Sequence, residues 1–138
     1  MRLLCFQAKR FAWKPFERTL PDAPAEPTAA EVHEALVAFV HIEQADCTAA
    51  REATVFRQTL KHLKWLANKR DLRTVVLHSF THLGADGAEP AAAQALLVSL
   101  AERLRATGYT AHVTAFGWLH EWELAVYGES LAKVWKQI

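Results

Sequence analysis

The chain has 138 residues, of which 51% are hydrophobic and 22% are charged, and these values are typical of one globular domain. Its two cysteines, Cys5 and Cys47, are too few and too far apart for a disulfide framework or a structural zinc site. No stretch approaches the roughly 20 apolar residues of a membrane helix, and the N-terminus lacks a signal-peptide pattern. We therefore expect one cytoplasmic domain over residues 1–138, with no membrane attachment.

The net charge of +1 is the sum of segments of opposite sign. Residues 22–46 contain six acids and no base, whereas residues 51–73 contain seven bases and two acids. A local basic surface suits contact with part of a nucleic acid, but not the broad phosphate contact of a strongly basic domain. On charge alone, a solvated helix face is the simpler interpretation. The bases concerned are Lys61, Lys64, Lys69 and Arg70.

The N-terminal half contains three apolar segments that we interpret as strands. Leu3–Phe6 is short and apolar, which favours a central strand, and Phe11–Trp13 begins a second strand. Three prolines impose extended backbone on Leu20–Thr28, which we predict to be a loop. Ala35–Ile42 is nearly continuous in apolar residues and rich in β-branched ones, so it is predicted to be a strand covered on both faces.

The period of the apolar residues then changes to that of a helix. Ala49–Lys69 is predicted to be amphipathic, with its bases mostly outside the apolar stripe. Arg73–Phe80 is again a short apolar strand. Pro90 begins a second helix and Gly108 lies just past its end, as expected for helix start and stop signals.

The C-terminal part is predicted to add two strands and a helix. Thr110–Thr114 and Trp118–Tyr127 are interpreted as strands joined through Phe116 and Gly117, and Ser130–Gln137 as a short terminal helix. The alternation of strands and helices indicates a layered α/β domain.

Three of the seven histidines are candidates for a functional site. His78 and His82 flank a strand end, where open α/β sheets bind ligands. His120 shares one face of the last strand with Trp118 and Trp122, because side chains alternate along a strand. The alternative is that His120 is a structural residue on a half-buried aromatic face.

Other chemistries have weaker support. Imidazoles suit zinc, but the His78 to His82 spacing spans a strand end and does not define a ligand geometry. The loop 83–88 leads into the helix at Pro90, whose free amides could receive a carboxylate or a phosphate. Ser79 and Thr81 lack the surroundings of a nucleophile elbow, so a serine hydrolase is not expected.

The order and spacing of several short motifs resemble the editing domain of archaeal threonyl-tRNA synthetases, almost from end to end. The motifs are Phe80-x-His82-Leu83, Pro90 before a helix, Gly108-Tyr109, and Phe116-Gly117 before an aromatic strand. The resemblance implies a mixed β-sheet with helices packed on it, as in the D-aminoacyl-tRNA deacylases. It also implies a homodimer that hydrolyses the ester of serine wrongly attached to threonine-specific tRNA, without a metal or another cofactor.

By this resemblance, His82 retains the family's histidine, whereas His120 replaces a lysine and Leu119 replaces a tyrosine. Further departures, expected to cluster at the site, are Gln7, Lys9 and Lys133 in place of a histidine, an aspartate and a glutamate. An imidazole at position 120 can orient or deprotonate water at neutral pH more readily than an ordinary ammonium.

We therefore expect a freestanding deacylase that acts in trans on the aminoacyl-adenosine end of tRNA, alone or with a synthetase partner. The alternatives are a non-catalytic descendant that binds a ligand or a protein, and a metal-dependent hydrolase built on the three histidines. The expected catalytic residues are His82 and His120, and the expected substrate-binding residues are His78, Phe80, Phe116, Gly117 and Trp118.

Overall fold

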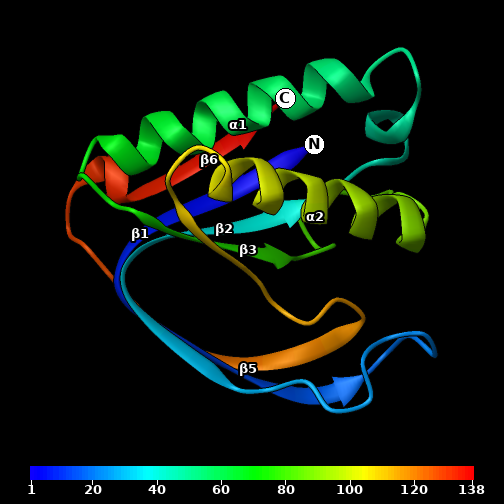
Figure 1. The fold of residues 1–138 in the computed structure, drawn as a ribbon, viewed down its shortest axis with the longest axis horizontal. Helices are drawn as coiled ribbons and strands as arrows, with labels where there is room; N and C mark the ends of the chain where they lie inside the picture. The colour runs from blue at the N-terminus through cyan, green and yellow to red at the C-terminus, as the bar shows by residue number, and fades with distance from the viewer.

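The computed structural model describes all 138 residues and contains one six-stranded mixed sheet (Figure 1). The strand order is β4-β3-β2-β1-β5, and β6 also pairs with β1. β1 and β2 are antiparallel, whereas β2, β3 and β4 run parallel to one another. The strands are β1 (Arg2–Arg18), β2 (Ala30–His41), β3 (Thr74–Ser79), β4 (Thr110–Val113), β5 (Trp118–Val126) and β6 (Lys133–Gln137).

Two helices, α1 (Glu52–Asn68) and α2 (Pro90–Arg105), cover one face of this sheet (Figure 1). Two short 3-10 turns, η1 (Gln44–Cys47) and η2 (Ser130–Ala132), lie in the connections. The main core of 23 buried residues fills the space between helices and sheet. The two longer predicted helices are confirmed, and Pro90 is the first residue of α2, where its missing amide proton costs no hydrogen bond. No helix is long and apolar enough to span a bilayer.

β1 is a single long strand that contains both predicted N-terminal strands. Its register shifts between Ala8 and Arg10 and again between Pro15 and Glu17. A proline cannot donate a ladder hydrogen bond. Pro15 accordingly lies beside the second irregularity, where the regular pairing with β5 is interrupted. The first part of β1 pairs with β6 and the later part with β5. Both strands therefore lie along the same edge of β1, opposite β2.

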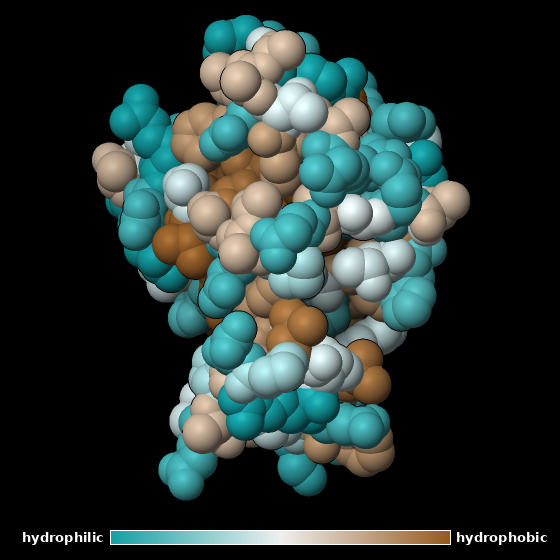
Figure 2. Space-filling model, turned by 90° about the vertical axis from the view of Figure 1, so that its right-hand side faces the viewer, coloured by the Kyte–Doolittle hydropathy of each residue, from teal (hydrophilic) through white to brown (hydrophobic).

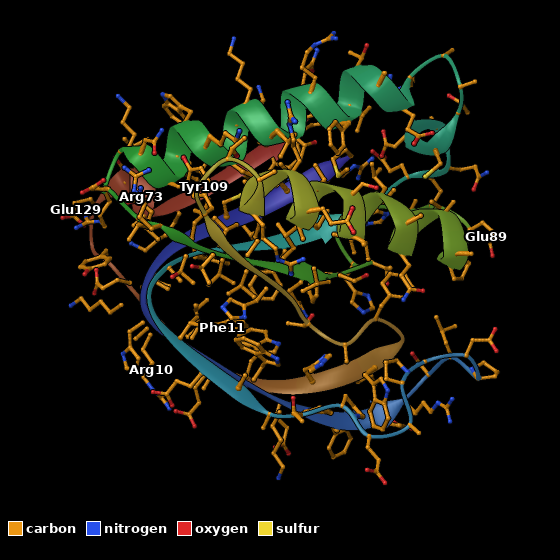
Figure 3. The ribbon with its side chains drawn as sticks, in the orientation of Figure 1. Arg10, Phe11, Arg73, Glu89, Tyr109 and Glu129 are labelled. Carbon is orange, nitrogen blue, oxygen red and sulfur yellow. The ribbon has the colours of Figure 1, made fainter.

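The later part of β1, the first part of β2 and β5 curve away from the helical layer and form a second lobe (Figure 1). A smaller core of six buried residues, including Phe11, Trp13 and Phe39, lies against the sheet face that the helices leave uncovered. Phe11 points into the space between the main sheet and β5 (Figure 3). Phe39 contacts Trp122 of β5 with ring centroids 5.3 Å apart, which joins the sheet to this lobe.

The predicted C-terminal helix over Ser130–Gln137 is wrong. Only η2 is helical, and the following five residues form the edge strand β6, which pairs with Arg2–Phe6 of β1. Val134 and Trp135 alternate between the two faces as strand residues do, and Val134 packs on the main core. The free edge of β1 decides this conformation, because the segment is too short for its own periodicity to distinguish helix from strand.

Candidate functional site

A cavity of about 490 Å³ lies where β3 and β4 end and where α2 and β5 begin. We call it the histidine pocket. Figure 2 shows apolar side chains between the upper body and the narrower lower lobe on the side of the molecule where these ends meet. The cavity lies outside the carboxyl ends of parallel strands, as expected for α/β sheets. All seven predicted site residues line it, namely His78, Phe80, His82, Phe116, Gly117, Trp118 and His120.

The lining of the histidine pocket has no formally charged side chain. Its 19 residues include no aspartate, glutamate, lysine or arginine, and 10 of them are hydrophobic. Histidine is therefore the residue type of this lining best suited to general acid-base chemistry. Acid-base chemistry carried out by the lining itself depends on imidazole.

His78 is held rigidly in the wall of the pocket. Its side chain is buried, and its Nδ1 atom lies 2.8 Å from the hydroxyl oxygen of Thr114, which is also buried. Burial, reinforced by the nearby His120, lowers the pKa of His78 to about 4, so the ring is neutral at pH 7. Thr114 was not among the predicted site residues. Thr114 could have been proposed from the sequence because it directly follows β4, whose end lies beside the end of β3.

His120 lines the pocket, and its two ring nitrogens have no hydrogen-bond partner. Its ring centroid lies 5.4 Å from that of His78, at an interplanar angle of 77°. Both of its nitrogens are inaccessible to solvent and have no hydrogen-bond partner. Burial lowers the pKa of His120, whereas the nearby backbone of Trp118 acts in the opposite direction. A neutral imidazole with free nitrogens is able to bind a water molecule or a polar substrate group.

His82 lies at the exposed side of the pocket, unlike the other two histidines. Its ring centroid is 5.2 Å from that of Phe80. No group of three or more histidine, cysteine or acidic side chains is arranged to hold a metal ion. The geometry therefore does not support the alternative of a zinc site made by His78, His82 and His120.

Gly117 lines the pocket and holds a loop at its rim. Its φ angle is 79°, and an added Cβ atom would lie 2.8 Å from the Cβ atom of Ala23. The carbonyl oxygen of Gly117 accepts hydrogen bonds from the backbone amides of Thr19 and Leu20, at 2.8 Å and 3.2 Å. The Nε1 atom of Trp118 donates to the carbonyl oxygen of Pro24 at 2.9 Å, so the proline-rich loop is tied to the start of β5.

The expected anion site at the start of α2 is not free. The Glu89 carboxylate accepts hydrogen bonds from the backbone amides of Ala91 and Ala92, at 3.0 Å and 3.3 Å. Glu89 is thus the N-cap of the helix (Figure 3), and its own negative charge occupies the positive end of the helix dipole. Pro90 and Ala93 contribute only apolar surface to the pocket.

Another histidine that sequence reasoning did not weigh holds the loop before α2. His41, at the end of β2, is buried, and its Nε2 atom contacts the carbonyl oxygen of Asp86. His41 and Asp86 are 45 residues apart, and no sequence motif indicates that they are in contact.

Only two of the five departures from the family pattern lie in the pocket. Leu119 and His120 line it, but Gln7 donates through Nε2 to the carbonyl oxygen of Leu66, 2.8 Å away. The Nζ atom of Lys133 donates to the carbonyl oxygen of Gly128, and that of Lys9 lies over the ring of Tyr127. The expectation that all five cluster at the site is therefore wrong.

These features define an α/β fold with a cavity at the carboxyl ends of its parallel strands. The chain belongs to the family described as the Archaea-specific editing domain of threonyl-tRNA synthetase, whose model matches residues 1–138. This membership confirms the resemblance seen in the sequence motifs.

Two relatives show how this domain occurs in longer proteins. The chain is 33% identical over 138 residues to a threonine-tRNA ligase editing subunit of Aeropyrum pernix, with 97% of this chain and 31% of that protein covered. It is 29% identical over 143 residues to a threonine-tRNA ligase of Staphylothermus marinus, with 100% and 22% covered. The chain thus spans less than a third of the length of these relatives.

A solved structure with a similar fold is that of the c-Myc DNA unwinding element binding protein. The TM-score is 0.69 at 11% sequence identity, and the match covers 100% of this chain and 99% of that one. At this identity the likeness concerns the fold alone. The predicted fold class, a mixed β-sheet with helices packed on it, is confirmed.

Proposed function

We propose that this protein hydrolyses the ester bond of mischarged aminoacyl-tRNA, with seryl-tRNA specific for threonine as the preferred substrate. The observation that carries the proposal is the convergence of His78, His82 and His120, from two distant segments, on one pocket of a family member. The pocket volume of about 490 Å³ is within the usual range for small-ligand sites. An aminoacyl group and part of the terminal adenosine are ligands of suitable size.

We propose that His120 acts on water, which requires its enclosed ring nitrogens to become accessible when the substrate binds. A free nitrogen of its neutral ring accepts a proton from a water molecule while the water oxygen bonds to the ester carbonyl carbon. The bond from that carbon to the ribose oxygen then breaks, and the imidazolium returns the proton to the leaving oxygen. His82, on the exposed side, is placed to contact the ribose or the amino group, and His78 binds the substrate from the wall.

The pocket's neutrality is consistent with an esterase of this kind. An aminoacyl ester has no carboxylate, and the lining offers no fixed cation that would select for one. Phe80, Phe116 and Trp118 supply flat apolar surfaces against which an adenine ring can stack. We propose these three, with Gly117, as substrate-binding residues.

The second candidate function is that of a non-catalytic descendant which binds an aminoacyl-adenosine-like ligand or a protein. It is favoured by the replacement of the family's lysine and tyrosine at His120 and Leu119, both in the pocket. Leu119 is 48% exposed and enlarges the apolar surface at the pocket rim.

The decisive experiment is a deacylation assay with purified protein on seryl-, threonyl- and D-aminoacyl-tRNA. The proposal expects rapid loss of serine from threonine-specific tRNA and slow loss of threonine. The matched control is a His82→Ala/His120→Ala double variant, which should approach the buffer rate. Binding of charged tRNA with every ester left intact would establish the non-catalytic alternative instead.

We further propose that the protein acts in trans in the cytoplasm as a homodimer, with or without a synthetase partner. Three large side chains outside the main core support the dimer, because such surface is unusual on a small monomer. They are Phe16, Trp122 and Trp135, which are 66%, 46% and 55% exposed.

A further inference from the structure

The outer side of α1 is a continuous basic surface. Residues 53–70 contain five lysines and arginines and no acid. Arg57, Lys61, Trp65 and Lys69 are spaced by four residues, so they follow one another along the same side of the helix at intervals of about 6 Å. The opposite side, which includes Leu63 and Leu66, is buried in the main core. Side chains with nitrogen ends project from α1 away from the sheet (Figure 3).

These cations are not neutralised by the protein itself. The neighbouring Arg70 pairs with Glu129 at 2.6 Å, and Arg73 pairs with Asp71 at 3.0 Å. By contrast, no carboxylate forms an ion pair with any of the outer cations. Like charges four residues apart destabilise a helix by a few tenths of a kcal/mol. The outer cations are Arg57, Lys61, Lys64 and Lys69.

An exposed aromatic residue lies among these cations. Trp65 is 44% exposed, and the Nζ atom of Lys69 lies 5.7 Å from its ring centroid. The His62 ring lies 5.8 Å from Trp65 at an angle of 31°, and burial together with Lys136 of β6 lowers the pKa of His62. Lys136 thus adds a further cation beside α1 without introducing an acid. Cations around an accessible indole are typical of surfaces that contact RNA.

We propose that this basic helix surface, defined as Arg57, Lys61, Lys64, Trp65, Lys69 and Lys136, binds the phosphate backbone of the tRNA outside its aminoacylated end. The proposal rests on the proposed function. The basic helix surface supplies the positive charge that the histidine pocket lacks. The pocket lining has no cation to attract RNA, and the net charge of the protein is only +1. α1 lies in the same layer as α2, whose first residue lines the pocket (Figure 1), so an RNA helix leaving the pocket can extend over this layer.

The test compares two double variants with the same net charge. Lys61→Gln/Lys69→Gln removes two cations from the basic helix surface, and Lys14→Gln/Arg103→Gln removes two exposed cations elsewhere. Each variant changes the formal net charge from +1 to −1. Affinity for uncharged threonine-specific tRNA is measured by fluorescence anisotropy at several salt concentrations, and deacylation is measured on full-length seryl-tRNA and on a seryl-CCA trinucleotide.

We expect the Lys61/Lys69 variant to bind tRNA roughly 10-fold more weakly and its salt slope to fall by about two, one for each lost phosphate contact. Its KM for seryl-tRNA should rise while kcat and the trinucleotide reaction stay unchanged. The Lys14/Arg103 variant should match the wild type. Equal tRNA affinity of the two variants would overturn the proposal and favour an acidic protein as the partner of this surface.

The same experiment distinguishes failure of the proposed deacylase function from failure of the RNA-binding proposal. If neither ester is hydrolysed by the wild type, the anisotropy measurement still reports whether the basic helix surface binds RNA. A loss of hydrolysis of the trinucleotide in the Lys61/Lys69 variant would also contradict the proposal, because that substrate is too short to leave the pocket region.

Discussion

The Nδ1 atom of His78 and the hydroxyl oxygen of Thr114, 2.8 Å apart and both buried, connect the ends of β3 and β4 in the wall of the histidine pocket. This hydrogen bond fixes the ring that faces His120, whose centroid is 5.4 Å away. The two strands are parallel neighbours, so their ends meet at one edge of the sheet. The pocket therefore inherits its geometry from the pairing of β3 with β4.

Replacing Thr114 by valine tests this hydrogen bond. The variant keeps the β-branched shape but leaves Nδ1 of the buried His78 without a partner. We expect a loss of about 1 to 3 kcal/mol in the free energy of unfolding, measured by urea denaturation. Thr110→Val, at the exposed first position of β4, is the control and should change the free energy by less than about 0.5 kcal/mol. Equal effects would show that the bond contributes nothing specific.

The pH dependence of stability should reveal the buried His78. Its folded pKa of about 4 lies below the ordinary value of 6.5, so the unfolded chain binds the proton first as pH falls. His78 should therefore remove up to roughly 3 kcal/mol of stability between pH 6.5 and pH 4. His78→Asn retains an amide near Thr114 but does not titrate, so its stability should fall less over this range. The carboxylates titrate in both proteins, so their contribution cancels when the two stabilities are subtracted. Parallel curves of stability against pH for the two proteins would refute the low pKa of His78.

His120→Phe separates a catalytic role from a structural one. Neither ring nitrogen has a protein partner, so replacing the ring by phenylalanine orphans no hydrogen bond. We expect an unchanged or slightly higher melting temperature and a fall of roughly 100-fold in single-turnover deacylation. His112→Phe, on β4 outside the pocket, serves as the control. An unchanged rate with a lower melting temperature would make His120 a structural residue.

Gly117→Ala should disturb both the backbone and the packing of the rim. The φ angle of 79° disfavours any side chain, and the added methyl group would meet Ala23 and Leu20 at less than 3 Å. We expect a destabilisation of roughly 2 kcal/mol or more, because strain and overpacking add. Gly108→Ala, with φ at 92° and open space around it, isolates the backbone cost, and Gly128→Ala has neither problem. Equal melting temperatures for the Gly117 and Gly128 variants would contradict this account.

A homodimer should be detected by light scattering at micromolar concentration. If the sheet face opposite the helices forms the contact, Trp135→Ser should weaken the dimer, because Trp135 pairs with Leu4 on that face and is 55% exposed. Trp65→Ser removes a comparably exposed indole from α1 and should leave the dimer intact. A monomeric wild-type protein would disprove the homodimer itself.

The sequence alone determined much of this domain, because the relevant signals are local. The apolar runs at Ala35–Ile42 and Arg73–Phe80 predicted β2 and β3, and the helical periodicity and Pro90 predicted α1 and α2. All seven predicted site residues do line one pocket, because β3 and β4 end side by side and the lobe formed by β1 and β5 brings Trp118 and His120 to the same place. Their chemical roles remain predictions.

Only the tertiary structure decided the remaining features, and in each case a distant partner is the reason. Lys133–Gln137 is a strand because β1 offers a free edge, although five residues are too few for periodicity to reveal it. Thr114 became part of the site through His78, 36 residues away, and Glu89 closed the end of α2 to anions. Hydrogen bonds and edges of this kind depend on separation in space, which the linear pattern of apolar residues does not encode.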